Sequence, residues 1–150
     1  HSIMKTTMDD LLTHLQKNID PAEDIRACMR KAIRSHVHFH LNRQRENFIA
    51  NSELRGLSPE HYQEIVRQRD AYERIFQTLI RKGMDEAAFA SGDEKILSYA
   101  ILTLCTAGAF WFKPKGRLKV DEIADIYADF ILRGLADGGL SKIETDVLSK

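Results

Sequence analysis

The sequence has no surplus of charge of either sign and little sign of β structure. Lysine and arginine together number 22, aspartate and glutamate together number 22, and the formal net charge is zero. Without a basic surplus to displace counterions from phosphates, the chain as a whole is not expected to bind nucleic acid. Sustained alternation of polar and apolar residues is absent, and the one Asp-Gly pair, at Asp137, lies in a polar tail. These absences favour an all-α fold.

The sequence also lacks the local signatures of catalytic and metal sites. It contains no Gly-x-Ser-x-Gly, no glycine-rich phosphate loop and no Glu-x-x-His, the last of which excludes a carboxylate-bridged di-iron bundle. Its two cysteines, Cys28 and Cys105, stand in apolar helical surroundings, which favours buried free thiols in a reducing compartment over a disulfide. No signal peptide is recognisable. We expect a cytoplasmic protein that is not an enzyme, with no cofactor and no metal.

The most apolar stretch runs from Lys95 to Phe112, where only serine and threonine interrupt the apolar residues. Asp93 provides an N-cap for this stretch, and Lys113-Pro114 ends it. The pattern predicts a central helix that is apolar around nearly its whole circumference and must be buried on more than one side. A second helix with apolar residues on more than one face is predicted to open at Asp121 and to reach Leu135.

Two such helices in succession need more cover than one chain of 150 residues supplies. A second copy can cover the other side, so we expect a homodimer in which these last two long helices form a four-helix interface. The alternatives are a monomer that wraps both helices internally and, less in keeping with the length of the run and the polar helices before it, a membrane span. The predicted interface residues are Leu97, Ile101, Leu104, Gly108, Trp111, Ile123, Tyr127, Phe130 and Ile131.

Four further helices are expected before the central one. The first is amphipathic over residues 2–18, and the second is predicted to begin with Asp20 as N-cap and Pro21 as its first residue, and to end near residue 43. A short third helix is expected over residues 46–50, followed by a fourth that opens at Ser58 and has Gly83 as its C-cap. The residues after Gly134 fray or add one short helix. This makes a single domain over residues 1–150, a bundle of about six helices.

Histidines on the second predicted helix are the first candidates for chemistry. His36 and His40 lie one turn apart on the same face, whereas His38 points elsewhere. The pair could reach one metal ion, but no cysteine or carboxylate on that face extends it to the three or four ligands that zinc requires. Lining of a polar pocket, or satisfied histidines in the core, are therefore the favoured interpretations.

Arg69 interrupts the apolar face of the fourth predicted helix. A buried guanidinium has to be paired, and Glu53 or Glu73 is the expected partner. The alternative is that Arg69 meets an anionic or carbonyl group of a ligand. Aromatic residues from three helices would fill an ordinary core or equally the wall of an apolar cavity.

Several short blocks, taken in order, resemble a known family. They are Glu53-Leu54-Arg55-Gly56-Leu57, Arg69-Asp70-Ala71-Tyr72-Glu73, Leu79-Ile80-Arg81-Lys82-Gly83, Phe89, Trp111-Phe112-Lys113-Pro114-Lys115-Gly116, Ile123-Ala124-Asp125-Ile126-Tyr127 and Gly134-Leu135. Their order and spacing are similar to the regulatory, C-terminal domain of TetR-family transcriptional repressors. The resemblance covers approximately residues 25–135.

The resemblance implies an all-helical domain that binds a small effector between its helices and dimerises through its last two long helices. It also implies a helix-turn-helix domain immediately upstream, which this sequence lacks, so operator DNA would be contacted only through that domain. Because the chain opens on His1, it is expected to be part of a longer protein. The Arg-x-x-Tyr-Glu and Trp-Phe-Lys-Pro-x-Gly blocks resemble regulators of lipid and acyl-thioester breakdown, which implies an apolar effector of the fatty acyl or acyl-CoA type.

Nine residues are the candidates for the effector pocket, with plain core packing as the alternative for most of them. They are His36, His40, Phe48, Arg69, Tyr72, Phe76, Leu102, Thr106 and Phe110. Two other classes of function remain open at this point. The first is a helical-bundle enzyme with His36, His40 and Arg69 as its active site, and the second is a purely structural dimerisation module without a cavity.

Overall fold

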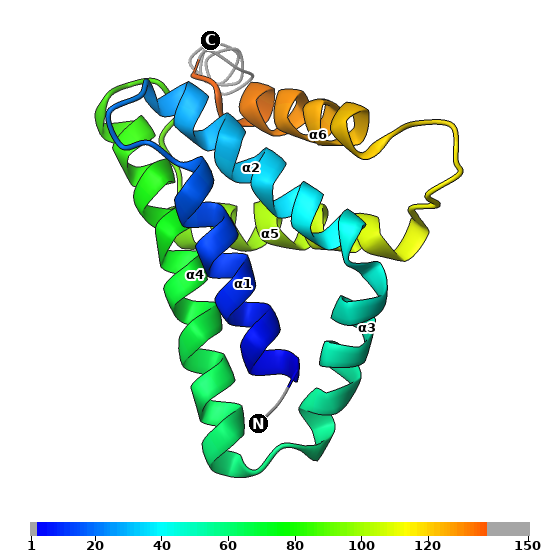
Figure 1. The fold of residues 1–150 in the computed structure, drawn as a ribbon. Helices are drawn as coiled ribbons and strands as arrows, with labels where there is room; N and C mark the ends of the chain where they lie inside the picture. Colours follow the sequence, from blue (N-terminus) through cyan, green and yellow to red (C-terminus); the bar gives the residue numbers. More distant parts are fainter. Residues whose placement is uncertain (1–2, 138–150) are drawn as a thin grey trace, which may run out of the picture.

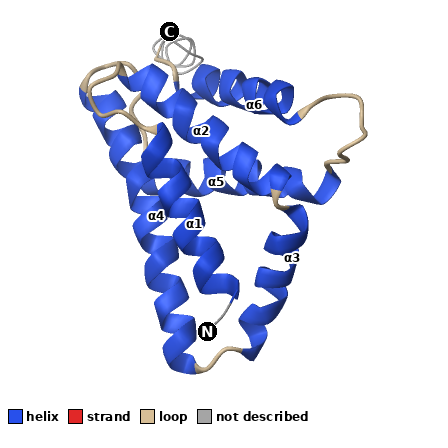
Figure 2. Cartoon of the chain, viewed as in Figure 1, coloured by secondary structure: helices blue, strands red, loops and turns tan. Residues whose placement is uncertain are grey.

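The computed structural model describes residues 3–137 and shows six α-helices, as expected (Figures 1 and 2). They are α1 (Ile3–Asn18), α2 (Ile25–Asn42), α3 (Gln44–Glu53), α4 (Pro59–Asp85), α5 (Glu94–Trp111) and α6 (Val120–Leu135), with a 3-10 turn η1 (Leu54–Gly56) after α3. Within residues 3–137 no strand forms, and one isolated antiparallel bridge joins Phe89 to Ala136. The expected all-α fold is confirmed. The tail that was expected to fray or form a short helix lies mostly in residues 138–150, outside the described residues.

Side-chain caps fix the starts of three helices. Asp93 accepts hydrogen bonds from two backbone N–H groups at the start of α5, and Ser58 accepts one at the start of α4, as predicted. The prediction for α2 was wrong, because Asp24 caps this helix and accepts from the N–H groups of Arg26 and Ala27. Asp20 instead accepts from the N–H of Ala22 at 2.9 Å and holds the turn that precedes α2.

Gly83 is not a C-cap, because α4 continues through it to Asp85. The reason for a glycine here is the close approach of another side chain: a Cβ at this position would lie 1.9 Å from Cδ2 of Phe89. The ring of Phe89 packs against the helix backbone and is almost completely buried. This contact ties the loop between α4 and α5 to the end of α4.

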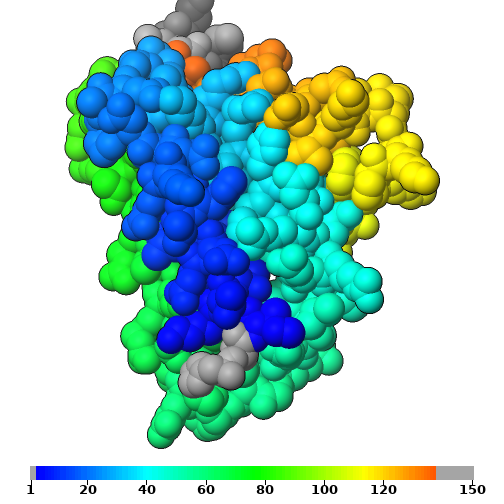
Figure 3. Space-filling model, in the orientation of Figure 1, coloured from blue at the N-terminus to red at the C-terminus, as the bar shows by residue number. Residues whose placement is uncertain are grey.

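The helix at the centre of the fold is α2, not α5 as the sequence suggested. α2 contacts each of the other five α-helices, and Met29, Ala32, Ile33 and Val37 on it are completely buried. α5 packs on α2 and α4 and leaves one face exposed. In the space-filling view, α1 covers the middle of one face of the molecule, between α4 and α3 (Figure 3). No helix in residues 3–137 has the length and apolarity needed to cross a membrane.

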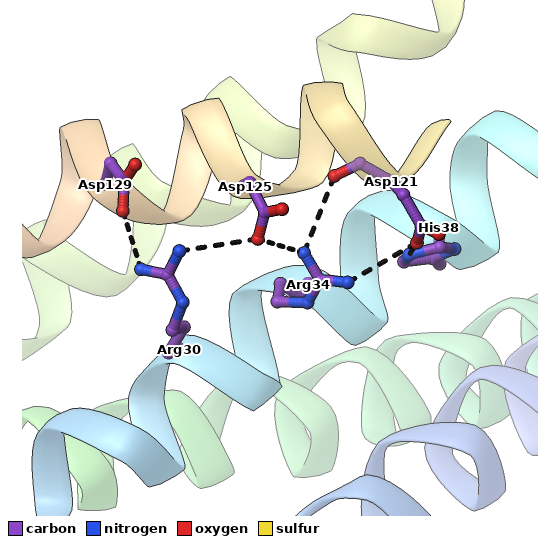
Figure 4. A network of polar contacts seen from close by, with 6 residues as sticks. All are labelled: Arg30, Arg34, His38, Asp121, Asp125 and Asp129. Atoms are coloured by element: carbon purple, nitrogen blue, oxygen red, sulfur yellow. Dashed lines mark hydrogen bonds and ion pairs between the residues drawn. The ribbon is translucent and has the colours of Figure 1, made fainter. Parts of the chain in front are cut away.

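A ladder of charged residues joins α2 to α6 along their outer sides (Figure 4). Its members are spaced four residues apart on antiparallel helices: Arg30, Arg34 and His38 on α2, and Asp121, Asp125 and Asp129 on α6. Nη1 of Arg30 lies 2.7 Å from Oδ1 of Asp129, and this guanidinium lowers the pKa of the Asp129 carboxyl. Arg34 contacts both Asp121 and Asp125. The ladder fixes the register of α6 on α2.

Candidate functional site

A cavity of about 450 Å³ lies among α1, α2, α3, α4 and α5. Its wall is mostly apolar, with a small number of polar side chains. The lining residues are Met4, Thr7, Met8, Leu11, His36, His40, Asn47, Ala50, Asn51, Arg69, Tyr72, Glu73, Tyr99, Leu102, Thr103, Thr106, Ala107 and Phe110. A concave, largely apolar site with a few convergent polar groups is typical of small-molecule binding.

The structure brings most of the predicted pocket residues to this cavity. His36, His40, Arg69, Tyr72, Leu102, Thr106 and Phe110 all line it. Phe48 does not, because α3 turns Asn47, Ala50 and Asn51 toward the cavity and leaves the Phe48 side chain 72% exposed on the other side. Phe76 does not line it either, since it lies one turn beyond Tyr72 on α4 and is completely buried in the core.

Sequence reasoning missed the contribution of α1 and, on α3, chose Phe48 in place of the residues that line the cavity. The first helix was predicted to be amphipathic, but the spacing of Met4, Met8 and Leu11 could not show that they face a cavity as well as the core. Asn47 and Asn51, one turn apart on α3, gave a signal that was not used. A pair of amides with this spacing marks one face of a helix as polar, and here this face turns toward the cavity.

The deepest polar group in the cavity wall is a chain of three side chains centred on His36. Its Nδ1 lies 2.6 Å from the hydroxyl of Tyr72, and its Nε2 lies 2.8 Å from Oγ1 of Thr106. Burial, and to a smaller extent neighbouring His40, lowers the pKa of His36 well below its ordinary value. Burial also raises the pKa of Tyr72 well above its ordinary value. At neutral pH these three hydrogen-bonded side chains, Tyr72, His36 and Thr106, are therefore uncharged. They join α4, α2 and α5.

His40 stacks on His36, with the ring centroids 4.1 Å apart. Nδ1 of His40 lies 3.0 Å from the backbone oxygen of His36, and since a carbonyl can only accept, Nδ1 carries the proton. Burial lowers the pKa of His40, so its ring is also neutral. The proton on Nδ1 leaves Nε2 as an acceptor, and no residue in 3–137 gives Nε2 a hydrogen bond.

The expected environment of Arg69 is wrong. The side chain is exposed at the edge of the cavity, and its guanidinium lies 3.4 Å from Oδ1 of Asn51, not against Glu53 or Glu73. Ile65, one turn earlier on α4, is buried, whereas Arg69 lies on a side of the helix that reaches water at the edge of the cavity. Arg69 connects α4 to α3 where the cavity opens.

An exposed apolar surface covers the outer sides of α5 and α6, and we call it the apolar strip. Its members are Ile96, Tyr99, Leu104, Phe110 and Trp111 on α5, and Ile126 and Phe130 on α6. Phe110 and Phe130 have exposed fractions of 82% and 66%. Exposed large apolar side chains that gather on two neighbouring helices indicate an interaction site. Tyr99 and Phe110 also line the cavity.

The structure divides the predicted interface residues into two groups. Leu104, Trp111 and Phe130 lie in the apolar strip, and Leu97 and Tyr127 are half-buried beside it. The remaining four, Ile101, Gly108, Ile123 and Ile131, are buried within the subunit and are not available to a partner. They lie on the inner faces of α5 and α6. At Gly108, for example, an added Cβ would meet the hydroxyl of Tyr127 at 3.3 Å and Leu41 at 3.5 Å.

Residues 22–135 match the family described as "Tetracyclin repressor-like, C-terminal domain". The chain belongs to this family. The match covers α2 to α6 and most of the cavity. TetR-family regulators are dimers that bind small-molecule effectors and operator DNA, so the chain is the C-terminal ligand-binding domain of a TetR-like regulator. No curated protein is similar enough to the sequence to count as a match.

Solved structures of regulators share the fold of this TetR-like domain. A bacterial regulatory protein of the tetR family from Rhodococcus RHA1 is 22% identical with a TM-score of 0.83, over 91% of this chain and 72% of that one. PfmR, a TetR-family transcriptional regulator from Thermus thermophilus, is 24% identical with a TM-score of 0.80, over 87% and 71%. AibR, in complex with isovaleryl coenzyme A and operator DNA, is 17% identical with a TM-score of 0.73, over 91% and 72%.

The enzyme alternative named His36, His40 and Arg69 as its active site. Both ring nitrogens of His36 are occupied, and Arg69 is exposed and bonded to Asn51. The family itself implies a non-enzymatic regulator. Among residues 3–137, no three histidine, cysteine or carboxylate side chains come together in a way that could hold a metal ion. Cys28 and Cys105 are buried free thiols, as the sequence predicted.

Proposed function

We propose that this chain is the effector-binding and dimerisation domain of a cytoplasmic transcriptional repressor, and that its effector is an apolar small molecule of the fatty acyl or acyl-CoA type. The cavity of about 450 Å³ is the observation that carries this proposal. Met4, Met8, Leu11 and Leu102 give it an apolar wall suited to an alkyl chain. The complex of the structural neighbour AibR with isovaleryl coenzyme A is a precedent for an acyl thioester on this fold.

The proposal places the dimer interface on the apolar strip. Two-fold symmetry would bring the strip of one copy against that of the other, so that α5 and α6 of both copies form a four-helix contact. Residues 1–150 would then act as one regulatory domain, with operator DNA bound through a separate helix-turn-helix domain. Phe110 and Tyr99 support the link between the two roles, since each belongs both to the strip and to the cavity wall.

The effector would act by shifting a population of two arrangements. Its influence can be no larger than the difference between its affinities for the two arrangements. α1 forms part of the cavity wall through Met4, Thr7 and Met8, so a ligand that fills the cavity contacts this helix directly. A change in the tilt of α1 would alter the spacing of two DNA-binding domains attached ahead of it.

Native mass spectrometry of the purified chain tests the proposal, because it reads subunit number and any bound small molecule together. We expect a dimer that retains or takes up decanoyl-CoA or decanoate, and that does not take up coenzyme A alone. Ala50→Phe should abolish uptake, because Ala50 is buried in the cavity wall and the added ring fills the space. Ala22→Phe, at an exposed turn position, is the matched control and should bind as the unaltered chain does. A monomer that takes up neither acyl ligand would refute the proposal.

A further inference from the structure

The hydrogen-bonded side chains Tyr72, His36 and Thr106 in the cavity wall have one more polar hydrogen than the hydrogen bonds among them employ. Tyr72, neutral His36 and Thr106 carry three polar hydrogens, one on each side chain, but only two contacts join them. If Tyr72 donates to Nδ1 of His36, then Nε2–H donates to Thr106 and the threonine hydroxyl keeps a free proton. If the imidazole has the other tautomer, the free proton is on the hydroxyl of Tyr72. Either way one hydroxyl donor remains, and both hydroxyl-bearing residues line the cavity.

His40 provides an acceptor in the same cavity wall. Nδ1 of His40 is committed to the backbone oxygen of His36, so the lone pair of Nε2 is the remaining polar function of the ring. The stacking of the two imidazoles, with centroids 4.1 Å apart, keeps the His40 ring next to the chain that holds the free proton. A donor and an acceptor therefore belong to the same stacked pair of rings and its partners, in an otherwise largely apolar wall.

We infer that the buried end of the effector carries a hydroxyl group, which accepts the free proton of the Tyr72–His36–Thr106 chain and donates its own proton to Nε2 of His40. This inference rests on the proposed function and names the chemical group that the cavity recognises. A hydroxyl is the smallest uncharged group that both donates and accepts, so it satisfies both positions at once. An alkyl end would leave two buried polar groups without partners, which is unfavourable.

A carboxylate does not fit the same position. It has no proton to donate to Nε2 of His40, and the two imidazoles beside it are neutral. Glu73 also lines the cavity and adds a charge of the wrong sign. Arg69 is the cation in the lining, and it lies exposed where the cavity opens. A charged end of an effector is therefore expected near Arg69, and the hydroxyl-bearing end near His40.

A ligand series on the unaltered chain tests the inference without any substitution. The probes are octan-1-ol, 1-methoxyoctane and octanoate, with affinities measured by isothermal titration calorimetry at pH 8. The ether keeps the acceptor oxygen and lacks the donor, and octanoate adds a charge. We expect octan-1-ol to bind about tenfold or more tightly than the ether, because a site that hydrogen-bonds a hydroxyl discriminates strongly against an analogue that cannot replace it. Octanoate can place its carboxylate near Arg69, so it measures how strongly a charged end binds in the same cavity.

Two variants assign the effect to the residues named. His40→Phe keeps a ring of similar size and removes the acceptor, so the preference for octan-1-ol over the ether should fall to about twofold or less. Thr103→Val is the matched control, because Thr103 lines the cavity on the same helix as Thr106 but makes no hydrogen bond within residues 3–137. This variant should keep the full preference.

The outcomes separate this inference from the proposed function. Equal affinities for octan-1-ol and 1-methoxyoctane in the unaltered chain would overturn the inference and leave the apolar cavity intact as an effector site. A preference that survives His40→Phe would overturn it too. If none of the three probes binds and decanoyl-CoA also fails to bind, the proposed function falls and the inference falls with it. Should His40→Phe not fold, the ligand series on the unaltered chain decides alone.

Discussion

Acidification is expected to destabilise the fold through the two stacked imidazoles. Burial lowers the pKa of His36 well below 6.5 and also lowers that of His40, whereas both return to about 6.5 when the chain unfolds. The unfolded state therefore binds protons more readily than the folded state. Their contribution to stability is fully present above the unfolded pKa and is lost as the pH falls below it.

The size of the effect follows from the titration of the unfolded state. A histidine that titrates at 6.5 when unfolded and stays neutral when folded loses about 1 kcal/mol of stability between pH 6.5 and 5.5. The pair thus accounts for up to about 2 kcal/mol, which is a substantial part of the 5–15 kcal/mol typical of a domain. His14 adds in the same direction, because partial burial and then the nearby cationic groups of His38, Arg43 and Lys17 lower its pKa.

Urea unfolding at pH 7.5, 6.5 and 5.5, with protein concentration and ionic strength held constant, measures this loss. His40→Phe should reduce the loss between pH 6.5 and 5.5 by as much as half, and His14→Gln reports the share of the partly buried imidazole of His14. Unfolding midpoints that agree at all three pH values would refute the reasoning. So would a loss of the same size in a chain without His36 and His40.

Four other predictions follow from particular contacts. Gly83→Ala should lower the free energy of unfolding by about 1–3 kcal/mol, because the new methyl group meets Phe89. Gly134→Ala has nothing within 4 Å of the new methyl group, so it should leave the free energy of unfolding unchanged or raise it by about 0.5–1 kcal/mol. Equal urea midpoints for the two variants would contradict this. Phe130→Glu should give a monomer in light scattering while Phe48→Glu stays dimeric, and a dimer in both would remove Phe130 from the interface. Arg34→Met should cost about 0.5–1 kcal/mol at low salt and less at 1 M NaCl; a loss independent of salt would point to packing instead. Burial raises the pKa of Cys105 to about 12, so iodoacetamide at pH 8 should alkylate it only after urea is added, and rapid native labelling would contradict this.

The sequence predicts the helices well because their signals are local. Asp93 before an apolar run and Ser58 before Pro59 both cap the helices that follow them. The start of α2 could not be decided in the same way, since Asp20 and Asp24 are both good caps four residues apart. Asp24 is the cap in the structure. The role of Gly83 could not be predicted from its own helix, because it depends on Phe89, which lies beyond the end of α4.

The cavity could be predicted only in part. Helical spacing places His36 and His40 on one face and Tyr72 on the face of α4 that meets it, but it cannot show whether Met4 and Met8 border a hollow or a packed core. The dimer surface could also be predicted only in part. An apolar residue on a helix that is apolar all round gives no sign of which side faces inward, so Ile101 and Ile131 were placed at an interface although they are buried within the subunit.

Two different faces of α2 impose a geometric condition on how this protein can change. His36 and His40 lie about a third of a turn around the helix from Arg30 and Arg34, which hold α6. One extra residue between these two sets would rotate everything after it by about 100°, so the imidazoles could not keep their cavity while the guanidinium groups kept their aspartates. New effector specificities in such a scaffold must therefore arise by replacing side chains along α2. The number of residues between the two sets, and with it their relative rotation around the helix axis, has to stay constant.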